Sequence, residues 1–324
     1  MHIAALSQAH ACGALAPRAD DPVVMNSETA ILSLTDGQER IDLRLDIGAI
    51  NMDTGLIVPT PAPASVTSGN PVDFTALDAE MAPTYINKDL WWSWPPSPQD
   101  TADGADDTGS GTATVLGQVQ LGPIEATALA ADDTAGLTAW LEANGYGLPT
   151  AVTDLLGHYV ERGWSFVALR LTGAEPLNGA LSPIRLEFAS DKLVYPMLLS
   201  QAATTPQSVT MYVLADHRQD VIFVNGDPVA QNVTWAREVQ DDTLKQRGSY
   251  LTAVTMKFQE PGTSITDDLA LIRAATDEEA GTVTVIEHHM TFLGTPIGWL
   301  LVFFTALIGA AVFLLMLIPK QRSS

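Results

Sequence analysis

The sequence predicts an α+β fold in which a β-rich extracytoplasmic domain with a central helical hairpin is followed by one C-terminal transmembrane helix. Three observations predict it. Segments with strand-like alternation lie on both sides of the middle of the chain, two helix-periodic segments lie within residues 131–162, and an uncharged apolar run of 22 residues lies near the C-terminus. The predicted order is therefore strands, a helix pair, strands and an anchor.

Residues 13–130 form the predicted β-rich and acidic first half. The segment from Arg40 to Ile47 places apolar residues on one face of a strand and charged residues on the other. Asp36 and Gly37 separate this segment from Ala30–Leu34, which indicates a β-hairpin. Two further short strands are expected in this half, at Gly55–Val58 and at Val115–Leu121.

Residues 131–162 form the predicted helical hairpin. Asp132 or Asp133 is a suitable N-cap for its first helix, and Gly145 suits the C-terminus of that helix. The second helix opens after Pro149 and ends at Gly163. Apolar residues at helical spacing support both helices: Leu137, Trp140 and Leu141, then Val152, Leu155, Leu156 and Tyr159.

Residues 163–293 form the predicted β-rich second half. Thr266, followed by Asp267 and Asp268, is typical of the start of a short helix. The remaining segments are rich in residues that favour strands. These expected strands are Trp164–Leu171, Ile184–Phe188, Val209–Leu214, Val221–Val224, Tyr250–Phe258 and Thr282–Ile286.

Residues 294–324 form the predicted transmembrane anchor and short basic cytoplasmic tail. The span from Ile297 to Ile318 carries no charge and would make about 33 Å of helix, against a hydrocarbon core of roughly 30 Å. A buried core helix is the alternative. We expect Thr295 to cap the helix, with Pro296 at its first position. The predicted interface anchors are Trp299, Lys320 and Arg322.

The charge balance sets the predicted location. The chain has 16 Lys and Arg and 38 Asp and Glu, for a net charge of −22, which argues against binding to the phosphate backbone of a nucleic acid. Lys320 and Arg322 follow the last acid and leave −24 on the rest of the chain. The positive-inside rule therefore predicts a single-pass protein of the cell membrane, bound to the lipid bilayer by its C-terminal helix, with an extracytoplasmic domain and a cytoplasmic C-terminus.

The N-terminal residues 1–12 are interpreted as the remnant of a signal peptide. Ala9-His10-Ala11 has the form of a signal-peptidase site. A lipid-modified Cys12 is the alternative. Because Cys12 is the single cysteine, the sequence excludes a disulfide framework and any cysteine-rich zinc site.

No catalytic motif is found, and we therefore predict no catalytic residues, no cofactor and no enzyme activity. There is no G-x-S-x-G elbow, no H-E-x-x-H pair and no Walker loop. Paired carboxylates that sequence spacing cannot reveal would still suffice for acid–base chemistry. An envelope hydrolase with a bound cation is accordingly the alternative function.

Two segments are candidates for binding. The first is an acidic loop whose carboxylates could bind Ca²⁺, with a solvated mobile loop as the alternative. The second is a group of tryptophans that could form a platform for sugar rings or a peptide, with a lid on the sheet or a position on the bilayer surface as the alternatives. The calcium candidates are Asp100, Asp103, Asp106 and Asp107, and the platform candidates are Trp91, Trp92 and Trp94.

Four segments in the middle of the chain resemble the bacterial family called Domain of Unknown Function 2330. They are Leu137–Tyr146, His158–Val167, Leu181–Phe188 and Leu193–Met197. Cys12-Gly13 and the proline-rich end of the strand at Val58 are similar as well. The resemblance implies a secreted or membrane-anchored envelope protein but no activity and no catalytic positions.

The leading functional hypothesis combines these features. We expect a non-catalytic protein whose acidic extracytoplasmic domain binds or supports another component of the cell envelope. The partner would be an envelope protein or a glycan.

Overall fold

The computed structural model describes residues 9–10, 13–16, 25–50, 55–82, 84–90, 117–122, 124–131, 133–171, 177–281, 283–289, 291–292, 295–296 and 304–313. The chain divides into two units. Unit 1 comprises residues 1–82 and 104–281, and unit 2 comprises residues 83–103 and 282–324. The domain boundaries predicted from the sequence stay predictions.

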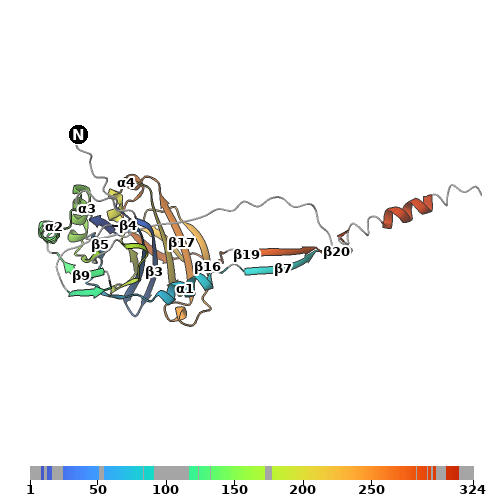
Figure 1. Cartoon of the computed structure of the whole chain (residues 1–324), viewed down its shortest axis with the longest axis horizontal. Helices are drawn as coiled ribbons and strands as arrows, with labels where there is room; N and C mark the ends of the chain where they lie inside the picture. The colour runs from blue at the N-terminus through green and yellow to red at the C-terminus, as the bar shows by residue number, and fades with distance from the viewer. Residues whose placement is uncertain are drawn as a thin grey trace, which may run out of the picture. The chain divides into compact units, whose positions relative to one another are not determined.

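Unit 1 is built around an eight-stranded sheet (Figure 1). All of its neighbouring strands pair antiparallel except β14 and β3, which pair parallel. In spatial order the strands are β16 (Asn232–Glu238), β17 (Tyr250–Phe258), β14 (Gln207–Ala215), β3 (Met25–Thr35), β4 (Gln38–Ile50), β12 (Ile184–Ala189) and β6 (Ser65–Ser68), with β11 (Leu177–Ala180) pairing with β4 beside this path.

A six-stranded sheet faces the first one. Its order is β1 (Ala9–His10), β2 (Gly13–Ala16), β5 (Gly55–Thr60), β10 (Ser165–Leu171), β9 (Ile124–Ala130) and β8 (Gly117–Leu121). Unit 1 also contains a three-stranded sheet of β13 (Leu193–Tyr195), β18 (Leu269–Arg273) and β15 (Gln219–Phe223). Buried side chains from all three sheets form one apolar core, in which Leu43, Val167 and Leu271 are representative members.

The β3–β4 hairpin confirms the turn predicted at Asp36 and Gly37. Thr35 pairs with Gln38, so the loop has two residues. Both loop residues have positive φ, 52° for Asp36 and 73° for Gly37. This is the backbone that a type I′ turn requires, and Asp-Gly is one of the sequences that adopts it readily.

The two helices predicted in the middle of the chain are present as α2 (Thr134–Ala143) and α3 (Thr150–Glu161). Asp133 caps α2 by accepting a hydrogen bond from the backbone nitrogen of Gly136 at 2.6 Å. Buried residues of both helices pack on the face of β5, β9 and β10 that is turned away from the main core, as with Leu156 against Ile57 and Phe166. The helices therefore form an outer layer on the six-stranded sheet (Figure 1).

A helix that follows Asn70 was not predicted, and the helix predicted at Thr266 is wrong. Helix α1 (Pro71–Glu80) begins after Asn70, whose side chain accepts a hydrogen bond from the nitrogen of Val72, and it packs on β3, β14, β16 and β17. The helix predicted to start at Thr266 is absent, because Leu269–Arg273 forms β18 between β13 and β15. The other helices described in unit 1 are two 3₁₀ helices, Leu198–Ala202 and Leu244–Gln246, and α4 (Pro261–Ser264).

Unit 2 contains two parallel paired strands, β7 (Thr84–Leu90) and β19 (Val283–His289). It also contains the short pair β20 (Thr291–Phe292) and β21 (Thr295–Pro296). Thr295 and Pro296, which the sequence suggested as the start of a helix, are therefore strand residues.

The predicted fold class is wrong in its C-terminal transmembrane helix, and the chain is described instead as a β-rich fold with short helices. Across the residues placed by the structure, none of the helices is both long enough and apolar enough to span a membrane. The helix that is described there covers residues 304–313, which corresponds to about 15 Å of rise. The predicted span ends Ile297 and Ile318, and Trp299, Lys320 and Arg322, lie outside the described residues.

Candidate ligand-binding site

The binding residues predicted from the sequence lie outside the described residues and stay predictions. These are the calcium candidates Asp100, Asp103, Asp106 and Asp107 and the platform candidates Trp91, Trp92 and Trp94. Where the structure does describe side chains, no group of three or more His, Cys, Asp or Glu could hold a metal ion. Other residues therefore form the candidate site described below.

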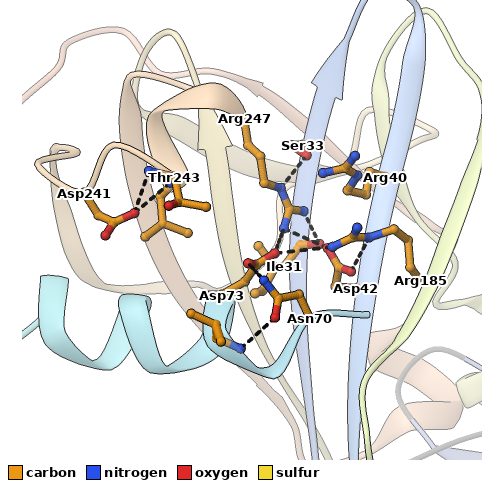
Figure 2. Close-up of polar contacts among 12 residues, drawn as sticks. Ile31, Ser33, Arg40, Asp42, Asn70, Asp73, Arg185, Asp241, Thr243 and Arg247 are labelled. Carbon is orange, nitrogen blue, oxygen red and sulfur yellow. Dashed lines mark hydrogen bonds and ion pairs between the residues drawn. The ribbon is translucent and has the colours of Figure 1, made fainter. Parts of the chain in front are cut away.

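A buried network of four charged side chains joins three elements of unit 1 and the loop before β17 (Figure 2). Asp42 on β4 pairs with Nε of Arg185 on β12 at 2.7 Å and with Nη1 of Arg247 at 2.7 Å. Asp73, in the first turn of α1, lies 3.3 Å from Arg185 and 3.4 Å from Arg247. The network thus contains two carboxylates and two guanidinium groups, so its net charge is zero.

Neighbouring polar groups add hydrogen bonds to this network. Arg247 donates from Nε to the Ser33 hydroxyl at 3.1 Å and from Nη2 to the Ile31 carbonyl at 3.4 Å. Asn70 donates to Oδ1 of Asp73 at 2.8 Å. Burial lowers the pKa of Arg247, and Asp42 and Asp73 oppose that effect. Because every member has a charged partner and little access to water, the network fixes α1 and β12 on the sheet and is poorly suited to catalysis.

A second pair of neighbouring carboxylates lies at the start of β18. Asp268 is completely buried, accepts a hydrogen bond from the Tyr159 hydroxyl at 2.5 Å and pairs with Nη1 of Arg162 at 3.1 Å. Asp267 pairs with Nη2 of the same arginine at 2.9 Å. Burial raises the pKa of Asp268, and the backbone nitrogens of Met197 and Leu198 partly offset this by donating to it. The two carboxylates therefore fix the position of the Arg162 guanidinium.

Arg162 lines a cleft of about 550 Å³ in unit 1, which we call the Arg162 cleft. Its side chain is 36% exposed, so the N–H groups not used by Asp267 and Asp268 are available to a ligand. Trp164 also lines the cleft, with its ring 5.1 Å from that of buried Tyr159. The full lining is Gly37, Pro61, Arg162, Trp164, Ala189, Ser190, Asp191, Lys192, Val194 and Val224.

A second cleft of about 650 Å³ borders the β12–β13 turn, residues 190–192. Asp191 and Lys192 line both clefts. Arg247 and His217 line only the second one, and His217 is already engaged by Asp277 at 2.9 Å. The side chain of Lys192 has no ion pair among the described residues, so the turn offers an uncommitted ammonium group to either cleft.

A family model described as "uncharacterized protein conserved in bacteria (DUF2330)" matches residues 6–272. The chain belongs to this family. The resemblance seen in the sequence is thereby confirmed. No curated protein matches this DUF2330 chain. Among solved structures, the crystal structure of baculovirus P35 matches with 9% identity and a TM-score of 0.31, covering 81% of this chain and 97% of that one. A score of that size does not establish a shared fold.

The segments that resemble DUF2330 supply several of the groups that pair with buried carboxylates. His158–Val167 contains Tyr159 and Arg162, and Leu181–Phe188 contains Arg185. In Leu193–Met197, the Tyr195 hydroxyl donates to Glu28 and the Met197 nitrogen donates to Asp268. Within His158–Val167, Tyr159 is buried as its helical spacing predicted, and Gly163 ends α3 with a φ of 71°.

Sequence reasoning missed the Arg162 cleft because its residues come from separate segments. Arg162 and Trp164 follow α3, whereas Ser190, Asp191 and Lys192 form a turn between two strands. One signal was available. An arginine and a tryptophan directly after a helix that ends in glycine are placed near the ends of the adjacent strands, a common position for binding residues.

Proposed function

We propose that unit 1 is a non-catalytic binding module and that its ligand is a glycan held in the Arg162 cleft. The combination of groups around the cleft carries this proposal. Trp164 offers an aromatic surface for the apolar face of a sugar ring, while Arg162 and Lys192 are donors and Asp191 is an acceptor for its hydroxyl groups. The cleft volume of about 550 Å³ lies in the range of small-ligand sites.

Charge favours an uncharged ligand over a polyanion. The protein carries a net charge of −22, and Asp267 and Asp268 stand behind Arg162. The field at the cleft therefore gives little attraction for several phosphate or carboxylate groups. A hydroxyl-rich ligand can use donors and acceptors together and does not depend on that field.

The alternative of a hydrolase with paired carboxylates has less support. The two pairs of neighbouring buried carboxylates, Asp42 with Asp73 and Asp267 with Asp268, are all ion-paired with arginines. General acid–base catalysis needs carboxylates that can reach a substrate and exchange a proton with it. A role in holding the fold explains these four residues better.

An extracytoplasmic location is part of the proposal, since the sequence resembles envelope proteins. Protease added to intact cells tests it. Digestion of unit 1 is the expected outcome, and protection until the cells are lysed would contradict it.

Short chito-, cello- and malto-oligosaccharides are suitable probes for the ligand, first on an array and then by calorimetry. We expect at least one series to bind, and Trp164→Ala and Lys192→Ala each to weaken binding about 10-fold, which corresponds to roughly 1.4 kcal/mol. Lys257→Ala is the matched control, because Lys257 is exposed on β17 and lines neither cleft. Binding that is unchanged in Trp164→Ala, or no binding by any series, would refute the proposal.

A further inference from the structure

Glu39 is an acid on the apolar face of β4. Across the sheet it pairs with Leu34 of β3 and Phe188 of β12, and the next residue on the same face is Ile41. Phe188 and Ile41 are members of the main core. Glu39 is 0% exposed, although an ionised carboxylate is very costly to bury without a partner.

The carboxyl group of Glu39 is tied to the lining of the Arg162 cleft. Its Oε1 accepts a hydrogen bond from the backbone nitrogen of Val194 at 2.9 Å, whereas its Oε2 has no hydrogen-bond partner among the described residues. The Ser190 hydroxyl lies beside this carboxyl and lowers its pKa, and it also donates to the Lys192 carbonyl at 2.5 Å. Val194, Ser190 and Lys192 all line the cleft.

Within the part of the chain that the structure describes, no charged side chain pairs with Glu39. On β4 and β12, Arg40 and Glu187 project from the opposite face and pair with each other at 2.7 Å. The charged residues at the ends of the surrounding strands, Asp36 on the β3–β4 turn and Asp191 and Lys192 on the β12–β13 turn, are exposed. Val194 is the neighbour from β13, and it contributes only its backbone nitrogen.

We propose that Glu39 is a proton-sensitive support of the Arg162 cleft: its neutral carboxyl holds the segment Ser190–Val194 against the sheet, and its ionisation displaces that segment. Burial raises the pKa of Glu39 from 4.5 to about 8, and the backbone nitrogen of Val194 and the Ser190 hydroxyl oppose the rise. Above that pH the charge needs water or a cation. The uncommitted ammonium group of Lys192 lies on the segment that would move. The consequence for ligand binding rests on the proposed function, whereas the movement of the segment does not.

Valine-selective ¹⁵N labelling of the intact chain tests the proposal without any ligand. The Val194 amide resonance is expected to titrate with a midpoint near pH 8, and that of Val224, which also lines the cleft, to shift with the same midpoint. In Glu39→Gln, which keeps an acceptor for Val194, both titrations are expected to disappear. Glu187→Gln is the matched control, because it removes an acid from the outer face of β12 and should leave both titrations intact.

The outcomes separate this inference from the proposed function. Resonances of Val194 and Val224 that stay constant through pH 8 in the wild-type chain would overturn the proton-sensitive support, whether or not Glu39→Gln folds. A titration that persists in Glu39→Gln would also overturn it. If the titration occurs as expected but no oligosaccharide binds, the support stands and the proposed ligand is wrong. If an oligosaccharide does bind, its affinity should fall above pH 8 in the wild type but not in Glu39→Gln.

Discussion

Replacing Arg247 by methionine is expected to lower the free energy of unfolding by about 3–5 kcal/mol. The Arg247 side chain is 6% exposed and pairs with Asp42 and Asp73, whose side chains are 0% and 7% exposed. After the substitution, these two carboxylates share the single guanidinium of Arg185, which leaves one buried charge uncompensated. Methionine fills much of the volume, so the loss reports the charge and its hydrogen bonds more than a cavity.

Arg40→Met provides the matched control on the same sheet. Arg40 pairs with Glu187 at 2.7 Å, but the two side chains are 34% and 35% exposed, so this loss should be about 0–1 kcal/mol. Urea unfolding followed by circular dichroism measures both free energies. Adding Asp73→Asn to Arg247→Met restores the charge balance and should recover part of the stability. Equal losses in Arg247→Met and Arg40→Met would refute the reasoning.

Three further predictions follow from the packing and the buried acids. Gly248→Ala should lower the free energy of unfolding by about 1–3 kcal/mol, because the added Cβ would lie 2.2 Å from a backbone nitrogen of β14. Gly262→Ala is the control in the same urea assay and should change that free energy little, since the atom nearest to its added Cβ is 3.7 Å away. Tyr159→Phe removes a hydrogen bond to buried Asp268 and should cost about 1.5–3 kcal/mol in that assay; an unchanged unfolding midpoint would contradict it. Folding raises the pKa of Glu39 from 4.5 to about 8, so the folded state binds more protons than the unfolded state between these pH values. The free energy of unfolding of the wild type, relative to that of Glu39→Gln, should therefore fall as the pH rises from 4.5 to 8. A difference that stays constant over this range would contradict the prediction.

Local patterns predicted the local structure well. The alternation after Arg40 gave β4, and the Asp36-Gly37 pair gave the hairpin with the correct turn. The apolar spacing and the glycines at 145 and 163 gave α2 and α3. These features depend on residues a few positions apart, so one sequence contains the information they need.

Other features depend on contacts between distant segments, and the sequence misled or was silent. Asp267 and Asp268 look like the first turn of a helix, but their side chains pair with Arg162, and the residues after them complete a sheet. Helix α1 was missed although Asn70-Pro71 is a suitable start, because its apolar residues do not form a clear stripe. Tertiary contacts decided both cases.

Glu39 could have been found from the sequence. It stands in phase with Ile41, on the face of β4 that the alternation assigns to the core. An acid at such a position needs either a partner or a raised pKa. What the sequence could not supply is the identity of its neighbour, since Val194 joins it only through the folding of a strand far along the chain.

The parallel pairing of β7 with β19 has a consequence for biosynthesis. Thr84–Leu90 leaves the ribosome long before Val283–His289, and the second part of unit 1 is made in between. At about 5–20 residues per second, roughly 10–40 s pass before the partner strand emerges. During that interval the backbone groups of Thr84–Leu90 that later bond to β19 have no partner strand. Transient pairing of this segment with a chaperone or with another copy of the chain would then compete with the folding of unit 2.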